Sequence, residues 1–193
     1  VLPDHENLGE IIICRTGYSG ELGFELLPKW DCVVELWKIL VAKIAKYDGR
    51  VCGLGARDTL RTEMGYPLHG HELSLGISPV EASTSWAVGW KKVSFLGSDV
   101  LLSQKNGSVE RKSVAIKSLD RGIPRAGMSV KNSQGEVIGE ITSGTFSPTL
   151  KHGIALALVS KEVAVGDQLV VDVRGRESQA EVVKLPFVTS HVR

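Results

Sequence analysis

The chain has 193 residues, with 23 Lys and Arg against 22 Asp and Glu, and its formal net charge is +1. This balance excludes a nucleic-acid binder that works by counterion release, because there is no basic surplus to neutralise phosphates. The steady supply of Val, Ile and Leu excludes disorder. The length suffices for one or two domains with a real core. Glycine is frequent, at 21 residues, which predicts many tight turns and a strand-rich chain.

The cysteines, the hydropathy and the first residues further limit the kinds of protein to which the chain can belong. The 3 cysteines form no CxxC pair and the histidines are scattered, so we expect neither a disulfide scaffold nor a zinc site, but buried thiols in a reducing compartment. No run of about 18 apolar residues occurs, which predicts no membrane span. The chain opens on Val1, and residues 1–6 are typical of mid-chain sequence. We therefore expect a fragment or a processed piece.

The first part of the chain predicts a mixed region of strands and helices. The β-branched run at residues 11–14 indicates a buried strand, and three glycines within residues 17–23 indicate a tight loop. A second strand is predicted over residues 24–27. Apolar residues recur at helical spacing from 33 to 44, which predicts an amphipathic helix of about four turns. A shorter helix is expected over residues 56–64.

From about residue 94 the pattern changes to short strands with turn signals between them. Strands are expected at residues 114–116, 128–130, 137–141, 153–159, 169–174 and 180–183. This spacing is typical of a small all-β barrel or sandwich. We therefore predict an α+β chain with two domains, residues 1–92 and residues 93–193.

Two charged residues are candidates for ligand binding. Glu25 lies between apolar neighbours in a predicted strand, where a carboxylate must be paired or face a pocket. The alternative is the polar face of an ordinary alternating strand, and the pattern favours neither. Arg57 follows a glycine-rich turn at the start of a helix, where its guanidinium can bind a planar anionic or carbonyl group. Locally, a surface charge cluster of residues 57, 58, 61 and 63 is the more common explanation.

Aromatic, histidine and hydroxyl residues give weaker signals. Tyr18, in the glycine loop, can stack on a ligand or simply anchor the loop. Trp86 can stack on a flat ligand, although filling a core is the commoner role. His69 and His71 lie two residues apart on a predicted loop, which is weak evidence for a metal, and we predict none. Residues 143–149 are expected to form a hydroxyl-rich loop without a Ser-His-Asp pattern.

Four segments together resemble the aminomethyltransferase family, the T-proteins of the glycine cleavage system. They are residues 15–25 (RTGYSGELGFE), 53–61 (GLGARDTLR), 141–150 (ITSGTFSPTL) and 184–188 (KLPFV). The last of them resembles the closing strand of the family. Their order and spacing agree with the family over essentially the whole chain, which makes the four together far more specific than any one.

The resemblance implies the end of a folate-binding α+β region followed by an antiparallel β-barrel domain. Family members are roughly twice as long, so the chain resembles their C-terminal half. The resemblance places the catalytic aspartate of the family in the other half, so no residue of this chain is expected to be catalytic. We therefore expect the isolated piece to be inactive and to self-associate through apolar surface that the other half would cover.

The resemblance also implies a reaction and its partners. A T-protein transfers a one-carbon unit from the aminomethyl-lipoyl arm of the H-protein to tetrahydrofolate, and ammonia is released. The implied ligand is tetrahydrofolate as acceptor substrate, and the implied partner is the lipoylated H-protein, with neither nucleic acid nor membrane involved. The implied location is the cytoplasm of a bacterium, or the mitochondrion of a eukaryote.

Carried over residue by residue, the resemblance implies four folate contacts. Glu25 matches the carboxylate that accepts from the N3–H and 2-amino groups of the pterin. Tyr18 matches an aromatic side chain that lines the folate site. Arg57 matches an arginine of the folate pocket, and Trp86 is a weaker candidate for the pocket wall.

Two rival interpretations remain open. The folate-binding half also occurs behind a flavin domain in dehydrogenases of dimethylglycine or sarcosine, and the length of the full gene would discriminate between the two. A non-enzymatic folate-binding relative that assists iron–sulfur assembly ranks lowest, because such relatives diverge in the helix that carries Arg57 and Asp58.

Overall fold

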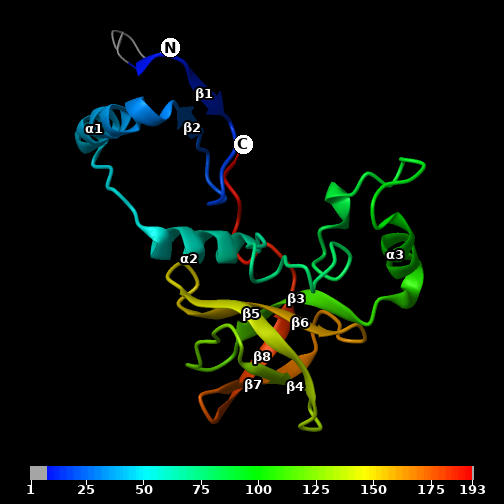
Figure 1. The fold of residues 1–193 in the computed structure, drawn as a ribbon. Coiled ribbons are helices and arrows are strands. Elements are labelled where there is room, and N and C mark those ends of the chain that lie inside the picture. Colours follow the sequence, from blue (N-terminus) through cyan, green and yellow to red (C-terminus); the bar gives the residue numbers. More distant parts are fainter. Residues whose placement is uncertain (1–7, 193) are drawn as a thin grey trace. The chain divides into compact units, whose positions relative to one another are not determined.

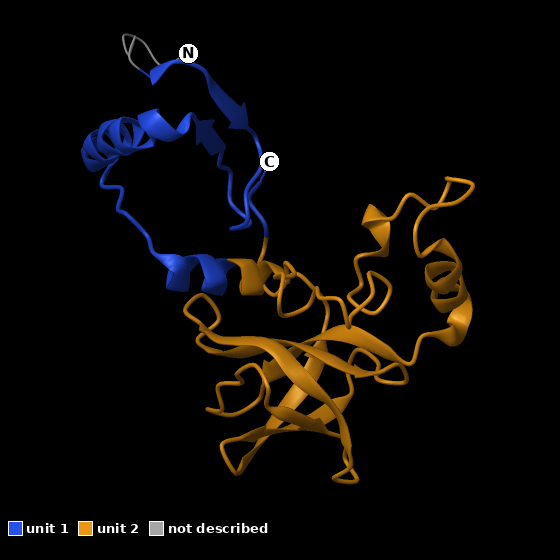
Figure 2. Cartoon of the chain, in the orientation of Figure 1, with its two compact units in different colours: residues 1–60, 190–193 blue, residues 61–189 orange. Residues whose placement is uncertain are grey.

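The computed structural model describes residues 8–192, so the opening segment, residues 1–6, lies outside the described residues. The chain forms two compact units, shown in Figure 2. Unit 1 comprises residues up to Leu60 together with the tail from Ser190, and unit 2 comprises Arg61–Thr189. The division falls inside one helix, α2 (Leu54–Met64).

Unit 1 contains a two-stranded antiparallel sheet and a helix (Figure 1). Strand β1 (Ile11–Cys14) pairs with β2 (Glu25–Pro28), with Ile11 opposite Pro28 and Cys14 opposite Glu25. Helix α1 (Val33–Ile44) follows, flanked by the short 3₁₀ turns η2 (Trp30–Cys32) and η3 (Ala45–Tyr47). Both strands and the amphipathic helix predicted from the sequence are therefore present, but the expected burial of residues 11–14 is wrong, since Ile12 and Ile13 are exposed.

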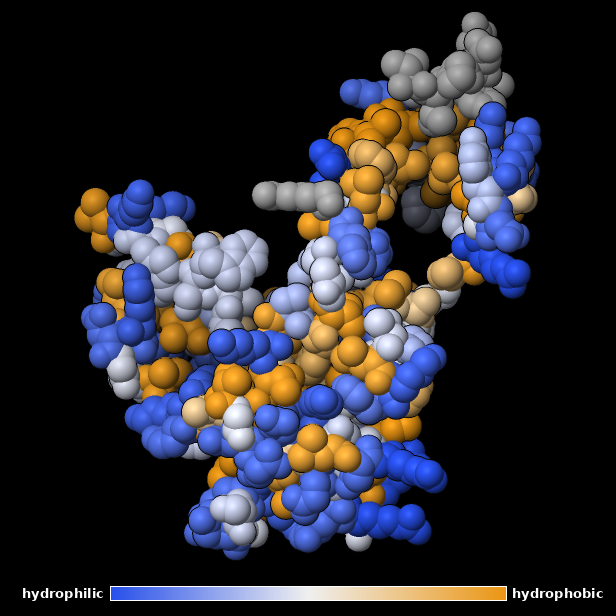
Figure 3. Space-filling view, turned by 180° about the vertical axis from the view of Figure 1, so that it is seen from behind, coloured by the Kyte–Doolittle hydropathy of each residue, from blue (hydrophilic) through white to orange (hydrophobic). Residues whose placement is uncertain are grey.

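The apolar side chains of unit 1 are mostly exposed. Among its described residues, only Leu8 and Leu36 are buried hydrophobic side chains. By contrast, Ile12, Phe24 and Trp37 are 60%, 60% and 53% exposed. Figure 3 shows hydrophobic residues in orange at the surface of this unit. An isolated two-stranded sheet is marginally stable in water, so unit 1 as it stands lacks the burial that usually stabilises such an element.

Unit 2 is built on a closed six-stranded antiparallel barrel, in the order β3-β6-β5-β4-β7-β8 (Figure 1). The strands are β3 (Arg111–Ser118), β4 (Ser129–Lys131), β5 (Val137–Ser147), β6 (His152–Ser160), β7 (Gln168–Val173) and β8 (Arg176–Val183). The barrel closes because β3 pairs with β6 on one side and with β8 on the other. This confirms the predicted α+β fold with an antiparallel barrel.

The barrel interior is a tightly packed apolar core. Inward side chains from every strand are almost completely buried, among them Ile116, Val130 and Ile141. At Gly139 a Cβ atom would lie 2.2 Å from the Leu158 carbonyl oxygen of the neighbouring strand. A side chain there would push β5 away from β6, so glycine permits the close approach of the two strands.

Two segments differ from the sequence-based expectation. Residues 143–147 belong to β5 and not to a loop, because their backbone pairs with β6 from Ser143 opposite Leu156 to Ser147 opposite His152. Conversely, residues 184–188 form no strand. A proline cannot donate a ladder hydrogen bond, and Pro186 follows a cis peptide bond in this irregular stretch.

The segment between α2 and the barrel is mostly irregular. It contains the 3₁₀ turn η4 (Ser85–Ala87), helix α3 (Ser98–Ser103) and the π-helical turn η5 (Gln104–Ser108). In the part of the chain that the structure describes, no helix has the length and apolar character needed to cross a membrane. The compact units divide the chain elsewhere than at residue 92, and the division into residues 1–92 and 93–193 stays a prediction.

Candidate functional site

Tyr18 and Arg57 meet in unit 1. Tyr18 is half-buried in the glycine-rich loop between β1 and β2, and Arg57 lies exposed in the first turn of α2. That turn begins at Gly53, whose carbonyl oxygen accepts from the backbone N–H groups of Ala56 and Arg57. The guanidinium carbon of Arg57 lies 4.2 Å from the centroid of the Tyr18 ring. This is a cation–π contact, in which the guanidinium of the exposed Arg57 lies over the Tyr18 ring.

Glu25 is the first residue of β2, and its side chain is exposed. Its Oε2 atom accepts a short hydrogen bond from the Thr16 hydroxyl of the preceding loop. The sequence did not single out Thr16, although it belongs to the same segment, residues 15–25, as Tyr18. The carboxylate is thus oriented by one hydroxyl donor, and it retains acceptor capacity for a ligand.

The C-terminal tail returns to the glycine loop of unit 1. The backbone N–H of His191 donates to the Gly20 carbonyl oxygen at 2.8 Å, and the Ser190 hydroxyl donates to the same oxygen at 3.2 Å. His191 Nδ1 lies 3.1 Å from Glu21 Oε1. The tail therefore fixes the loop that carries Tyr18, a role that the sequence alone did not indicate.

Trp86 belongs to unit 2, whereas Tyr18, Glu25 and Arg57 belong to unit 1. It belongs to η4 in unit 2, is 84% exposed, and borders a cavity of about 720 Å³. His71 Nδ1 lies 2.8 Å from the carbonyl oxygen of Thr142. Among residues 8–192, no group of three or more His, Cys, Asp or Glu is placed to hold a metal ion.

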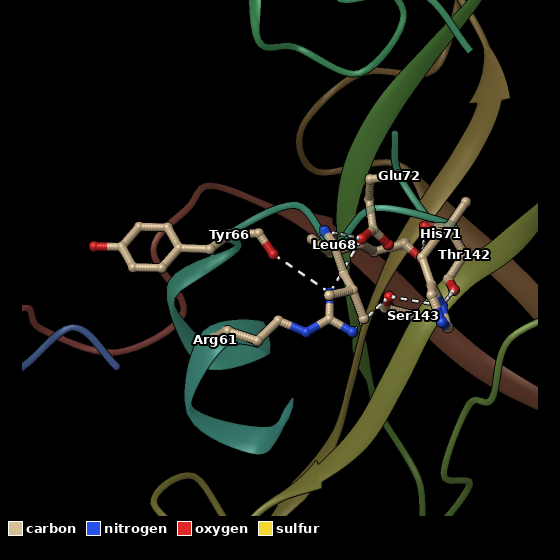
Figure 4. A network of polar contacts seen from close by, with 8 residues as sticks. Arg61, Tyr66, Leu68, His71, Glu72, Thr142 and Ser143 are labelled. Carbon is tan, nitrogen blue, oxygen red and sulfur yellow. Dashed lines mark hydrogen bonds and ion pairs between the residues drawn. The ribbon is translucent and has the colours of Figure 1, made fainter. Parts of the chain in front are cut away.

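A buried polar network centred on Arg61 was not predicted (Figure 4). Arg61 is 1% exposed and Glu72 is 2% exposed. Arg61 Nη1 donates to Glu72 Oε2 at 3.0 Å, and Arg61 Nη2 donates to the Ser143 hydroxyl at 2.8 Å. Figure 4 also shows the dashed contact from Arg61 to the Tyr66 carbonyl oxygen, which is 3.3 Å long. The network ties the last turn of α2 to strand β5.

Glu63 forms a second polar link between the last turn of α2 and the end of β5. It is 2% exposed, its Oε1 atom accepts a short hydrogen bond from the Ser147 hydroxyl, and its Oε2 atom accepts from the Thr149 hydroxyl at 3.3 Å. A surface charge cluster around Arg57 that includes Arg61 and Glu63 is therefore wrong, because these two side chains are buried in unit 2.

One signal in the sequence could have revealed these links. Hydroxyl residues alternate through the end of β5 and beyond, at positions 143, 145, 147 and 149. In a strand, residues two apart share one face. The alternation therefore indicates a strand with a hydroxyl-lined face, and buried hydroxyls require polar partners such as Arg61 and Glu63.

Two known family models match the chain, one over its first part and one over the barrel. Residues 6–92 match the GCVT N-terminal domain, and residues 111–189 match the glycine cleavage T-protein C-terminal barrel domain. The second match covers the strands of the closed barrel.

Similar proteins give the same result. The chain is 54% identical over 183 residues to an aminomethyltransferase of Parafrankia sp. (strain EAN1pec), covering 95% of this chain and 50% of the relative. It is 52% identical over 184 residues to an aminomethyltransferase of Mycobacterium leprae (strain TN), covering 94% and 50%.

A solved structure agrees with these matches. The glycine cleavage system aminomethyltransferase T from Bartonella henselae superposes with a TM-score of 0.85 at 32% identity, over 93% of this chain and 50% of that one. The chain thus spans about half the length of the relatives it matches, and it belongs to the glycine cleavage T-protein family of aminomethyltransferases.

Proposed function

We propose that this chain contributes the tetrahydrofolate-binding surface of an aminomethyltransferase. The enzyme transfers a one-carbon unit from the aminomethyl-lipoyl arm of the H-protein to tetrahydrofolate and releases ammonia. Membership of the family supports this proposal, and the bacterial relatives support a cytoplasmic location. The activity, the substrates and the H-protein partner belong to the whole protein, of which the matched relatives are about twice as long.

The observation that carries the proposal is the pairing of Tyr18 with Arg57. Residues from a loop and from a helix start meet at 4.2 Å, although they are distant in the sequence. A guanidinium stacked over an aromatic ring, on an exposed residue, suits a flat ligand with carbonyl or carboxylate oxygens. A folate has both features.

Glu25 fits the other edge of such a ligand. A pterin presents two parallel N–H donors, and a carboxylate is their complementary acceptor. Thr16 donates to one oxygen of Glu25 and holds the carboxylate in place. In this proposal these residues bind and orient the acceptor, so that its nucleophilic nitrogen meets the incoming carbon. None of them acts as the catalytic group.

Replacing Glu25 tests the carboxylate. In a protein that joins this chain to the half of the Parafrankia relative outside the match, we expect Glu25→Gln to weaken tetrahydrofolate binding by about 1.5–3 kcal/mol, the range of a hydrogen bond to a charged group. Titration calorimetry measures the effect. Glu35→Gln is the control. Glu35 is 57% exposed, and its carboxylate lies 3.9 Å from the Lys38 ammonium, which is a long distance for an ion pair. An unchanged affinity would remove Glu25 from the site.

Replacing Arg57 separates charge from geometry. Lysine keeps the positive charge but loses the planar fork and its stacking on Tyr18. We expect Arg57→Lys to raise the dissociation constant for tetrahydrofolate about tenfold in the same joined protein, while the exposed Arg50→Lys leaves it unchanged. If Arg57→Lys binds like the parent while Arg57→Ala unfolds the protein, Arg57 is structural.

A further inference from the structure

The loop that carries Tyr18 is costly to order. Three glycines lie within residues 17–23, and glycine loses more conformational freedom on folding than any other residue. Inside the loop, the backbone N–H of Glu21 donates to the Ser19 hydroxyl over a long 3.4 Å. Because fixing the backbone of such a loop costs conformational entropy, we expect its conformation to depend on contacts from outside the loop.

The C-terminal tail supplies two such contacts at Gly20. This residue is buried, and its φ of 78° lies in the left-handed region that favours glycine. Its carbonyl oxygen accepts from the His191 backbone N–H at 2.8 Å and from the Ser190 hydroxyl at 3.2 Å. Loop and tail both belong to unit 1, and Figure 1 shows the red tail beside the blue loop. A buried carbonyl group needs hydrogen-bond donors, and here the tail provides them.

These two hydrogen bonds matter more than the ion pair beside them. His191 Nδ1 lies 3.1 Å from Glu21 Oε1, but the two side chains are 66% and 57% exposed. A pair with this exposure contributes little, because water and salt screen it. The groups that hold the loop are therefore the backbone N–H of His191 and the hydroxyl of Ser190, which act on the buried Gly20.

Gly20 is close in sequence to Tyr18, whose ring lies 4.2 Å from the guanidinium carbon of Arg57. We propose that Ser190 and His191 are positioning residues, which hold the loop in the conformation in which Tyr18 lies under Arg57. The inference rests on the folate role proposed above for these two side chains. When only a fraction of the molecules has the competent conformation, the apparent Kd rises in inverse proportion to that fraction. Loosening the tail should therefore weaken binding although the tail need not touch the ligand.

The position of Tyr18 can be tested without a ligand. The 193-residue chain has 3 tyrosines, so 3-fluorotyrosine labelling gives one 19F resonance for each, and Tyr18→Phe assigns that of Tyr18. Ser190→Ala combined with His191→Pro removes both donors. We expect this double variant to move the Tyr18 resonance and to leave that of Tyr66, in unit 2, unchanged. Val192→Pro is the matched control, because its proline leaves both donors in place. An unmoved Tyr18 resonance in the double variant would overturn the proposal.

Tetrahydrofolate binding tests the consequence in the joined protein described above. We expect the double variant to raise the Kd about tenfold and Val192→Pro to leave it unchanged. Adding the double variant to Tyr18→Leu should cause no further loss, since the tail acts through the loop that carries Tyr18. An equal loss in both backgrounds contradicts the proposal. So does a lower melting temperature of the double variant with an unchanged Kd, which is the result expected of a purely structural tail.

The two measurements separate this inference from the proposed function. If the Tyr18 resonance moves in the double variant but Tyr18→Leu binds tetrahydrofolate like the parent, the tail holds the loop and the folate role of Tyr18 is wrong. If Tyr18→Leu weakens binding and the double variant does not, the folate role stands and the positioning role of Ser190 and His191 is wrong.

Discussion

The 193-residue chain alone is expected to form no methylenetetrahydrofolate from tetrahydrofolate and aminomethylated H-protein. The matched relatives are about twice its length, and the proposed folate contacts here only bind and orient. In addition, Phe24 and Trp37 of unit 1 are more than half exposed, so the binding surface lacks its apolar support. The same exposed residues favour self-association of the chain, which sedimentation would detect.

Complementation is the decisive form of this experiment. The half of the Parafrankia relative outside the match is assayed alone, with this chain, and with this chain carrying Glu25→Gln. We expect turnover only in the mixture with the unaltered chain and a reduced rate with the variant. Full turnover by the 193-residue chain alone would show that it contains the catalytic group after all.

Arg61→Met is expected to lower the free energy of unfolding of unit 2 by about 3–5 kcal/mol. The substitution leaves Glu72 buried without its counter-charge, and removing one partner of a buried ion pair has a cost of this size. The Ser143 hydroxyl also loses its donor. Denaturant unfolding followed by circular dichroism measures the change.

Two further variants make the result specific. Lys131→Met removes the pair with Glu177, which is 65% exposed, and we expect a loss of about 0–1 kcal/mol, as for other surface pairs. Arg61→Met combined with Glu72→Met removes both buried charges, so part of the stability should return. A loss below about 1 kcal/mol in Arg61→Met alone would contradict the assigned role of the network.

The barrel could be predicted from the sequence because its strands have local signals. Apolar alternation and turn residues located β3, β6 and β7 to within a few residues, as in the match between the expected 169–174 and the observed Gln168–Val173. The helix over residues 33–44 was equally clear, since apolar side chains recur at helical spacing. Leu36 is the buried residue of this helix, and periodicity shows which face is apolar but not whether a partner covers it.

The site could be predicted only in part. Glu25 and Arg57 were identified by residue type and by resemblance, and their contacts with folate stay predictions. Burial of Arg61 and Glu63 was missed, because charged residues in a helix normally indicate a solvated face. Their hydroxyl partners lie about eighty residues away in β5, so the alternating hydroxyls indicate a polar face on that strand but not which distant side chains pair with it.

The return of the tail to Gly20 has a mechanical consequence. The bridge between Glu21 and His191 joins the glycine loop after β1 to the C-terminal tail, so all of the residues between these two form one closed loop. Tension applied across the two ends is borne first by the hydrogen bonds of Ser190 and His191 to Gly20. The barrel strands lie within this loop, so we expect them to bear tension only after the hydrogen bonds of Ser190 and His191 break.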